Sequence, residues 1–375
     1  MISRLGVCRA RRVATVVFRH PLRTAGPVLV ALLVTAIPLF GIHFALPDES
    51  VLPTDAASRQ VSDILRHQYP AQSNAVITLV SKGPIDAATT TAAARLLATV
   101  PHVTSVEFGT GSFGADAPGS AHPGLTAGGY QQLKVHTDVP AGSDAADTVV
   151  TALRGSSVGT PAAGFLVGGA AASLHDTLAG IGRPLPAVLA IIVITTFILL
   201  FLFTGSVVQP LRALVVNGLS LSAALGIVTW IFQDGHLIGI FGATVRPMDA
   251  SMTVLLLCIA FGLSMDYEVF LASRITELHF AGADLRTAVT QGLARTGRIV
   301  TSAAVLLSVS FFAFATSSVS MLQLFGFGAG LAVLIDATLV RGVLVPAVMR
   351  LLGPANFWAP KPLRALHRKV RLSEE

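Results

Sequence analysis

The sequence contains too few charged residues for a water-soluble protein of its length. Asp, Glu, Lys and Arg account for 12% of the 375 residues, whereas hydrophobic residues account for 53%. A soluble domain needs roughly 25% charged residues to keep its surface hydrated. The apolar residues are also gathered into long runs, so the composition predicts an integral membrane protein.

Cysteine is nearly absent, with Cys8 in a basic N-terminal segment and Cys258 inside an apolar run. Neither position favours a disulfide framework, because one belongs on the inner side and the other within the bilayer. The polar middle of the chain lacks a cluster of metal-ligating residues and a nucleophile–base motif. We interpret its scattered histidines, His102, His122 and His136, as solvated, and we expect no metal site, no cofactor and no enzymatic activity.

Acidic residues are missing where basic residues are concentrated. Residues 1–24 contain six Arg and no acid, and residues 346–375 contain six Lys or Arg and two Glu. Between Pro47 and Gly180 the balance reverses, with six basic and eleven acidic residues. This distribution follows the positive-inside rule and predicts cytoplasmic termini and an outside middle segment. It argues against nucleic-acid binding as the purpose of the net charge of +6.

Six apolar runs reach the length of about 20 residues that a membrane-spanning helix requires. The first, Pro27–Leu46, follows a basic segment, so a cleaved signal peptide is the alternative. Its apolar stretch is longer than the roughly 7–15 residues of a signal peptide core, which favours an anchor. The other five are Pro186–Thr204, Leu211–Phe232, Ala250–Ala272, Ile299–Thr316 and Leu322–Val345.

These runs predict a bacterial plasma-membrane protein with one span, an outside domain and then five spans. The linker before Ile299 carries four arginines and belongs inside, where an amphipathic elbow lies along the membrane surface. The predicted segments are a cytoplasmic N-terminus (1–24), a first transmembrane helix (25–46), an extracytoplasmic α/β domain (47–182), transmembrane helices two to six (183–346) with the elbow at 275–295, and a basic cytoplasmic tail (347–375).

The outside domain alternates between strand-like and helix-like patterns. A helix is predicted first, at Asp55–Tyr69. Two β-α-β units follow, which are typical of a split βαβ, ferredoxin-like module. The predicted elements of these units are strand Ala75–Val80, helix Ile85–Val100, strand Val103–Phe108, strand Gln132–Thr137, helix Ser143–Leu153 and strand Phe165–Gly168.

Three carboxylates occur inside predicted spans, namely Asp266, Glu268 and Asp336. Each costs about 2.5–3.5 kcal/mol to insert, so such residues normally face a bundle interior or water and are candidate proton carriers. Asp266 suits this role because the adjacent Tyr267 offers a hydroxyl that can donate to it. Gly262, one turn earlier, leaves room for a helix or water. A helix-packing hydrogen bond without proton transfer is the alternative interpretation.

The other two carboxylates have structural alternatives. Glu268 points about 200° away from Asp266 around an α-helix, close enough to the inner surface to pair with Arg274. Asp336 lies five residues before Arg341, and the two are either a structural ion pair or part of the proton path.

Polar and small residues of the last two spans complete the candidate set. Thr301 and Ser308 are seven residues apart, hence on one helix face, and are expected to add to a polar core. Gly326 and Gly330 form a GxxxG pattern, which favours close helix packing.

Three stretches resemble a known family: GLSMDYEVFLASRITE, AVTQGLARTGRIVTSAA and QLFGFGAGLAVLIDATLVRGVLVPAVMRLLG. They are similar to the C-terminal six-helix half of the MMPL (mycobacterial membrane protein large) transporters of the resistance–nodulation–division superfamily. The match is close from about Arg246 to Trp358 and looser over the first span and the outside domain. The resemblance implies that Asp266 and Tyr267 form a proton relay and that an outside porter domain handles lipidic or amphiphilic substrates.

The resemblance also implies a missing component. Full-length members of the family have two such halves, each with one Asp–Tyr pair, whereas this chain has one. We therefore expect proton-driven export together with a second half or as a homo-oligomer, among membrane lipids. The alternatives are a non-transporting assembly or scaffold subunit, a degenerate remnant, or a SecF-like export factor, from which the GLSMDYEVF motif points away.

Overall fold

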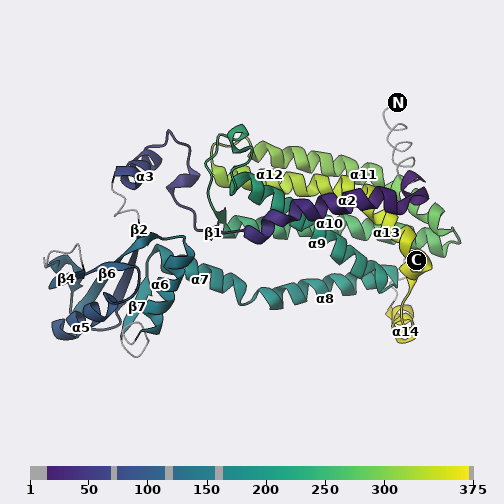
Figure 1. The fold of residues 1–375 in the computed structure, drawn as a ribbon. Coiled ribbons are helices and arrows are strands. Elements are labelled where there is room, and N and C mark those ends of the chain that lie inside the picture. Colours follow the sequence, from purple (N-terminus) through teal and green to yellow (C-terminus); the bar gives the residue numbers. More distant parts are fainter. Residues whose placement is uncertain (1–14, 69–73, 115–120, 157–163, 371–375) are drawn as a thin grey trace. The chain divides into compact units, whose positions relative to one another are not determined.

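The computed structural model describes residues 15–68, 74–114, 121–156 and 164–370. The chain divides into two compact units. One is helical and combines Met1–His43 with Pro186–Glu375, and the other is an α/β unit at Phe44–Leu185. Figure 1 shows the helices of the first unit and the sheet of the second.

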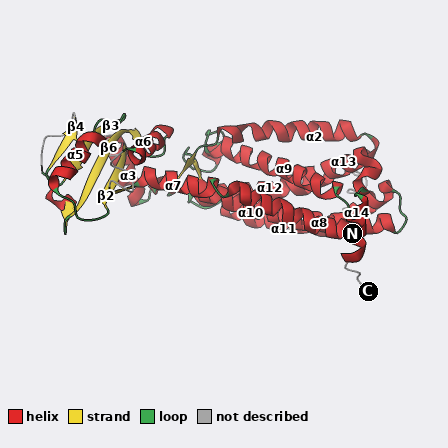
Figure 2. Ribbon diagram, turned by 90° about the horizontal axis from the view of Figure 1, so that it is seen from below, coloured by secondary structure: helices red, strands yellow, loops and turns green. Residues whose placement is uncertain are grey.

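The helical unit is a bundle of long, nearly apolar helices (Figures 1 and 2). Its last long helix changes from α-helical to π-helical winding at Asp336. In chain order, the elements are α2 (Pro21–Ala36), η1 (Ile37–Gly41), α8 (Leu185–Thr204), α9 (Val208–Phe232), η4 (Ile238–Ile240), β8 (Met248–Asp249), α10 (Ala250–Phe280), α11 (Leu285–Phe314), α12 (Ser320–Ile335), the π-helix η5 (Asp336–Leu344), α13 (Val345–Leu352), η6 (Gly353–Phe357) and α14 (Lys361–Val370).

Five helical stretches in the described residues are long and apolar enough to cross a membrane: Pro21–Gly41, Ala170–Thr204, Val208–Phe232, Ala250–Phe280 and Ser320–Phe357. The first part of the second stretch, up to Leu185, belongs to the α/β unit. A sixth is added if the bent pair Leu285–Ala294 and Ile299–Phe314 counts as one span. Multiple spans are thereby confirmed, although the first candidate span begins at Pro21 and not near residue 25. Proline suits this position, because the first turn of a helix does not need its N–H group.

The amphipathic elbow predicted at 275–295 is divided between two helices. Residues up to Phe280 continue α10, and Gly282, with φ of 95°, allows the short turn before α11. The following residues form the first part of α11, which meets Ile299–Phe314 at 45°. Both sides of the turn pack inward, since Ile275 and Val289 are fully buried in the bundle core.

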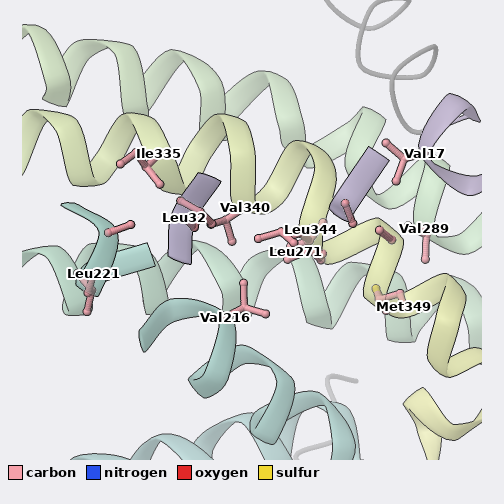
Figure 3. Packing of buried hydrophobic residues seen from close by; sticks show 14 of the residues in the cluster. Val17, Leu32, Val216, Leu221, Leu271, Val289, Ile335, Val340, Leu344 and Met349 are labelled. Atoms are coloured by element: carbon pink, nitrogen blue, oxygen red, sulfur yellow. The ribbon is translucent and has the colours of Figure 1, made fainter. Parts of the chain in front are cut away.

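Apolar side chains from most helices meet in one core (Figure 3). Leu32 of α2, Val216 of α9, Leu271 of α10 and Val340 of η5 all belong to it. The outer surface is also apolar, as Phe40 is 91% exposed and Leu306 is 69% exposed. A soluble protein does not expose such large apolar side chains over a contiguous surface, whereas a bilayer solvates them.

Glycines allow the helices to approach closely. A Cβ atom on Gly326 would lie 2.5 Å from the carbonyl oxygen of Phe311, and one on Gly330 would lie 2.9 Å from the ring of Phe312. The close packing predicted from the GxxxG pattern is therefore confirmed. Gly226 of α9 does the same for α2, because its Cβ would lie 2.0 Å from the carbonyl oxygen of Thr35.

The α/β unit contains a six-stranded sheet with the order β4-β3-β6-β2-β7 and with β5 paired to β6 (Figure 2). Each of these strand pairs is antiparallel. Its elements are β1 (Phe44–Ala45), η2 (Glu49–Val51), α3 (Ala57–Gln68), β2 (Asn74–Ser81), α5 (Ala87–Leu97), β3 (Val103–Phe108), β4 (Gly111–Gly114), η3 (Pro123–Leu125), β5 (Thr126–Ala127), β6 (Tyr130–Pro140), α6 (Asp144–Gly155), β7 (Phe165–Gly168) and α7 (Ala170–Gly182).

Strand periodicity places one face of this sheet against helices. Ile77 and Leu133 are fully buried, and they share a core with Ala94 of α5, Val150 of α6 and Ala172 of α7. The opposite sheet face is more open, with Leu166 57% exposed. The two β-α-β patterns predicted from sequence are therefore confirmed as elements.

Histidines of this unit have carboxylate neighbours. The distance from His102 Nδ1 to Asp138 Oδ1 is 2.9 Å, and the distance from His136 Nε2 to Glu107 Oε1 is 3.3 Å. His102 is solvated as predicted, with its side chain 48% exposed, whereas the His136 side chain is only 28% exposed. Sequence reasoning could not find these His–carboxylate pairs, because each pair joins different strands or loops of the sheet.

Gly226→Ala tests the contact between α2 and α9. The added Cβ collides with the Thr35 carbonyl, and overpacking of this kind costs about 1–3 kcal/mol. Gly218→Ala is the matched control on the same helix, since a Cβ there has nothing within 4 Å. We expect a lower midpoint of thermal unfolding in detergent for Gly226→Ala only. Equal midpoints for the two variants would contradict the contact.

Asp176→Asn tests the tie between α6 and α7. Arg154 donates two hydrogen bonds, of 2.6 and 2.9 Å, to the Asp176 carboxylate. They lower the carboxyl pKa below its ordinary value in the folded protein. The pair therefore stabilises the fold above about pH 3.9, the pKa of a free carboxyl, and its contribution is lost as the pH falls through the lower folded pKa. Because Asp176 is 60% exposed, screening limits the effect to about 0.5 kcal/mol.

The measurement is the hydrogen-exchange protection factor of the α7 amides, which corrects for intrinsic exchange rates. Asp176→Asn should lower it about twofold at neutral pH, and the difference should narrow below about pH 3.9. Asp55→Asn, which removes an exposed carboxylate before α3, is the control. A difference that persists unchanged in acid would contradict the assignment.

Candidate functional site

Helix α10 carries two of the three carboxylates that the sequence places inside predicted spans. It begins at a buried cap, where the Asp249 carboxylate accepts a hydrogen bond of 2.7 Å from the Met252 amide. It then packs against α9, α11 and α12. Asp266, Tyr267 and Glu268 are consecutive, so they point in three different directions around the helix. The three side chains therefore have different neighbours in the structure.

Asp266 lies on the face of α10 that no other helix of the described chain covers. We call this face the open stripe; its members, at intervals of three or four residues, are Leu255, Cys258, Gly262, Asp266 and Phe270, all exposed. A Cβ on Gly262 would meet nothing within 4 Å. Within the described residues, no hydrogen bond or ion pair reaches Asp266. An uncovered carboxylate on an otherwise apolar helix face requires water or a polar partner.

Tyr267 lies between the open stripe and the bundle interior. Its ring is half-buried, and the guanidinium carbon of Arg341 lies 4.7 Å from the ring centroid. This is a cation–π contact, favourable by about 0.5–2 kcal/mol when desolvated. Tyr267 therefore links the segment that carries Asp266 to the charged centre of the bundle.

That centre is an ion pair between Asp336 and Arg341, both at least 94% buried. Arg341 Nη2 donates to Asp336 Oδ2 at 2.6 Å and to the Ser264 carbonyl at 2.9 Å. The Ser264 hydroxyl donates to Asp336 Oδ1 at 2.8 Å. Residues five apart diverge by about 140° in an α-helix, but the i→i+5 turn of a π-helix brings them to one side. The π-helical winding of η5 thus makes this pair geometrically feasible.

Glu268 is also buried, and its partner differs from the predicted one. It accepts a hydrogen bond from Arg212 of α9, while Arg274 bonds instead to the exposed Glu277. The prediction of a Glu268–Arg274 pair was wrong because α10 continues as one helix, so Glu268 faces α9. Arg212 and Ser264 were missed by sequence reasoning. Arg212 had a usable signal, since it is a cation inside the predicted span Leu211–Phe232.

Thr301 and Ser308 do not join this centre. Thr301 is exposed, and Ser308 is buried against α12, where its hydroxyl donates to the Gly330 carbonyl at 3.3 Å. The shared helix face predicted for them is therefore not a polar core. Ser308 instead links α11 to α12 beside the close contact between Gly330 and Phe312.

The described residues contain no group of three or more His, Cys, Asp or Glu side chains that could hold a metal ion. What the site offers chemically is proton exchange. Three carboxylates lie in or beside the bundle interior, and a phenol lies next to one of them. A carboxyl group binds and releases a proton, and a phenol can donate or accept a hydrogen bond next to it.

The MMPL family profile matches residues 50–371 of this chain. The chain is 39% identical to the membrane protein SCO6666 of Streptomyces coelicolor, over 92% of this chain and 46% of that protein. It is 34% identical to the trehalose monomycolate exporter MmpL3 of Mycolicibacterium smegmatis, over 97% of this chain and 36% of that protein. It is 33% identical to the mycolic acid-containing lipids exporter MmpL11 of the same organism, over 52% of this chain.

The chain therefore spans less than half the length of the relatives it matches. Together with the apolar helices, these similarities identify a multi-pass membrane protein.

Arg341→Met tests the central ion pair. Removing one member of a buried pair costs about 3–5 kcal/mol, because the remaining charge has no partner. The double variant Asp336→Asn with Arg341→Met removes both charges, so it should unfold at a higher temperature than Arg341→Met alone. The midpoint of thermal unfolding in detergent measures both. A double variant no more stable than the single variant would show that Asp336 does not depend on Arg341.

Proposed function

Because the chain belongs to the MMPL family, we propose that it acts as one half of a proton-motive-force-driven exporter of lipidic or amphiphilic molecules. The relatives named for export of trehalose monomycolate and of mycolic acid-containing lipids support this substrate class.

The proposed topology places both termini in the cytoplasm of a bacterium and the α/β unit outside the plasma membrane. The basic residues at both chain ends and the acidic excess between Pro47 and Gly180 support it, because positive charge is retained on the inner side. On this topology the Phe280 end of α10 faces the cytoplasm.

The α/β unit is proposed to be a ferredoxin-like porter domain that handles the substrate outside the membrane. In such a fold the strands of a βαββαβ unit take the spatial order 4-1-3-2. The order β7-β2-β6-β3, with α5 and α6 packed on one face, supports the assignment.

The open stripe of α10 is the observation that carries the proton site. Asp266 and Tyr267 form the proposed relay, because Asp266 has access to water or a partner and Tyr267 contacts the charged centre. One charge crossing 100 mV supplies about 2.3 kcal/mol, which is enough to drive transport if several protons move per substrate. Gly262 leaves room for the partner beside Asp266.

The same stripe indicates that a second half, from another chain or another copy, covers Asp266. A carboxylate that faces lipid costs about 2.5–3.5 kcal/mol, and a polar partner removes this cost. The alternative is a non-transporting assembly or scaffold subunit of an envelope lipid export system. It is favoured by the single Asp–Tyr pair that this chain supplies.

Proton flux into proteoliposomes under an imposed pH gradient tests the proposal. Asp266→Asn keeps the shape of the side chain but cannot carry a proton, so we expect flux to fall about a hundredfold. Asp234→Asn is the matched control, because this exposed carboxylate lies in a loop after α9.

Two results would overturn the transporter proposal. The first is a folded wild-type protein without flux, which favours the scaffold alternative. The second is unchanged flux in Asp266→Asn, which removes Asp266 from the proton path.

A further inference from the structure

The buried face of α10 carries a second row of polar residues, opposite the open stripe. Ser264, Glu268 and Thr276 lie at multiples of four residues, and each contacts a side chain of another element. Ser264 donates to Asp336, Glu268 accepts from Arg212, and Thr276 accepts a hydrogen bond of 3.3 Å from Gln209 Nε2. We call these three residues and their partners the buried polar row.

The buried polar row extends from the middle of α10 towards its Phe280 end. Ser264 and Thr276 are twelve residues apart, or about 18 Å along an α-helix. This distance is more than half of the roughly 30 Å of a bilayer core. On the proposed topology the row therefore connects the Asp336–Arg341 centre to the cytoplasmic side.

Several polar atoms along the row have no hydrogen-bond partner in the described chain. They belong to side chains that are at least 94% buried, and they are Arg212 Nε and Nη1, Arg341 Nε and Nη1, and Gln209 Oε1. A buried group left unsatisfied costs about 1–3 kcal/mol, and nearly all such groups are paired with protein or water. Polar, enclosed atoms of this kind are the usual partners of internal water.

Glu268 interacts with charged side chains of α9 and η5. Arg212 of α9 neutralises it, Asp336 of η5 repels it, and Arg341 lies beside Asp336. Asp266 and Tyr267 on its own helix point elsewhere. When Glu268 binds a proton, the Arg212 guanidinium loses its counter-charge. The uncompensated positive charge then favours release of the proton. The surface pair Arg274–Glu277 has no such constraint, because water screens it.

Resting on the proposed function, we propose that Glu268 is a second proton-carrying residue of this half. A proton arriving from the Asp336 centre through internal water binds the Glu268 carboxylate, and the Arg212 hydrogen bond to it weakens. The proton then passes to water beside Thr276 and Gln209 and leaves at the cytoplasmic end. Glu268 returns to a carboxylate paired with Arg212, so charge and protons balance.

The first test is proton flux in the same proteoliposomes. Glu268→Gln retains the shape and a carbonyl oxygen that accepts from Arg212, and its midpoint of thermal unfolding in detergent checks that the fold persists without the counter-charge. Flux should fall about a hundredfold, and Glu268→Asp, which keeps a carboxyl group, should restore part of it. Glu277→Gln, from the surface ion pair, is the matched control and should not change flux.

The second test does not need transport. Infrared difference spectra of the reconstituted protein, taken between acidic and alkaline buffer, should contain a protonated-carboxyl band that is missing in Glu268→Gln. An identical carboxyl region in wild type and Glu268→Gln would overturn the role of Glu268, whatever the flux.

The experiments distinguish failure of the transporter proposal from failure of the role of Glu268. Flux that depends on Asp266 but not on Glu268 would overturn only the present inference. A Glu268-dependent infrared band in a protein without flux would support a titrating Glu268 while overturning transport by the isolated half.

Discussion

The buried ion pair between Asp336 and Arg341 requires a helix geometry that an α-helix does not provide. The two residues are five positions apart, and only the wider turn of η5 brings both side chains to the same side. Once formed, the pair fixes Ser264 of α10 through two contacts and holds a guanidinium over Tyr267. The orientation of α10, and therefore the exposure of Asp266 on one face and the burial of Glu268 on the other, follows from this arrangement.

Helix α10 consequently presents two polar surfaces with different electrostatics. On the open stripe a single carboxylate, Asp266, lies among apolar and small residues. In a bilayer this carboxylate needs water or a polar partner from outside the described chain. On the buried side each charge is matched within the bundle, Glu268 by Arg212 and Asp336 by Arg341. On the proposed function, the first surface suits association with a second half, and the second suits a proton path within one half. Tyr267 is the residue through which the two surfaces influence each other.

Much of this architecture follows from simple sequence patterns. Hydrophobic runs predict the spans, because a bilayer imposes their length, and alternating residues predict β3 and β7 with the bounds that the structure shows. What the sequence did not predict depends on contacts between distant segments. Arg212 and Glu268 are 56 positions apart in the chain and belong to different helices. The π-helical turn has no sequence signature. The bounds of the elbow differ from the structure because amphipathic periodicity does not mark where α10 ends and α11 begins.

The contact between α2 and α9 bears on how the protein is synthesised. The two helices meet at Gly226, and Gln233 at the end of α9 bonds to the Gly41 carbonyl at 2.7 Å and to the His43 amide at 2.8 Å. The whole α/β unit lies between these partners in the chain. At about 5–20 residues per second, a ribosome needs roughly ten seconds or more to reach α9 after completing α2. During that interval α2 lacks its contact with α9, so insertion of the first helix into the membrane precedes assembly of the bundle.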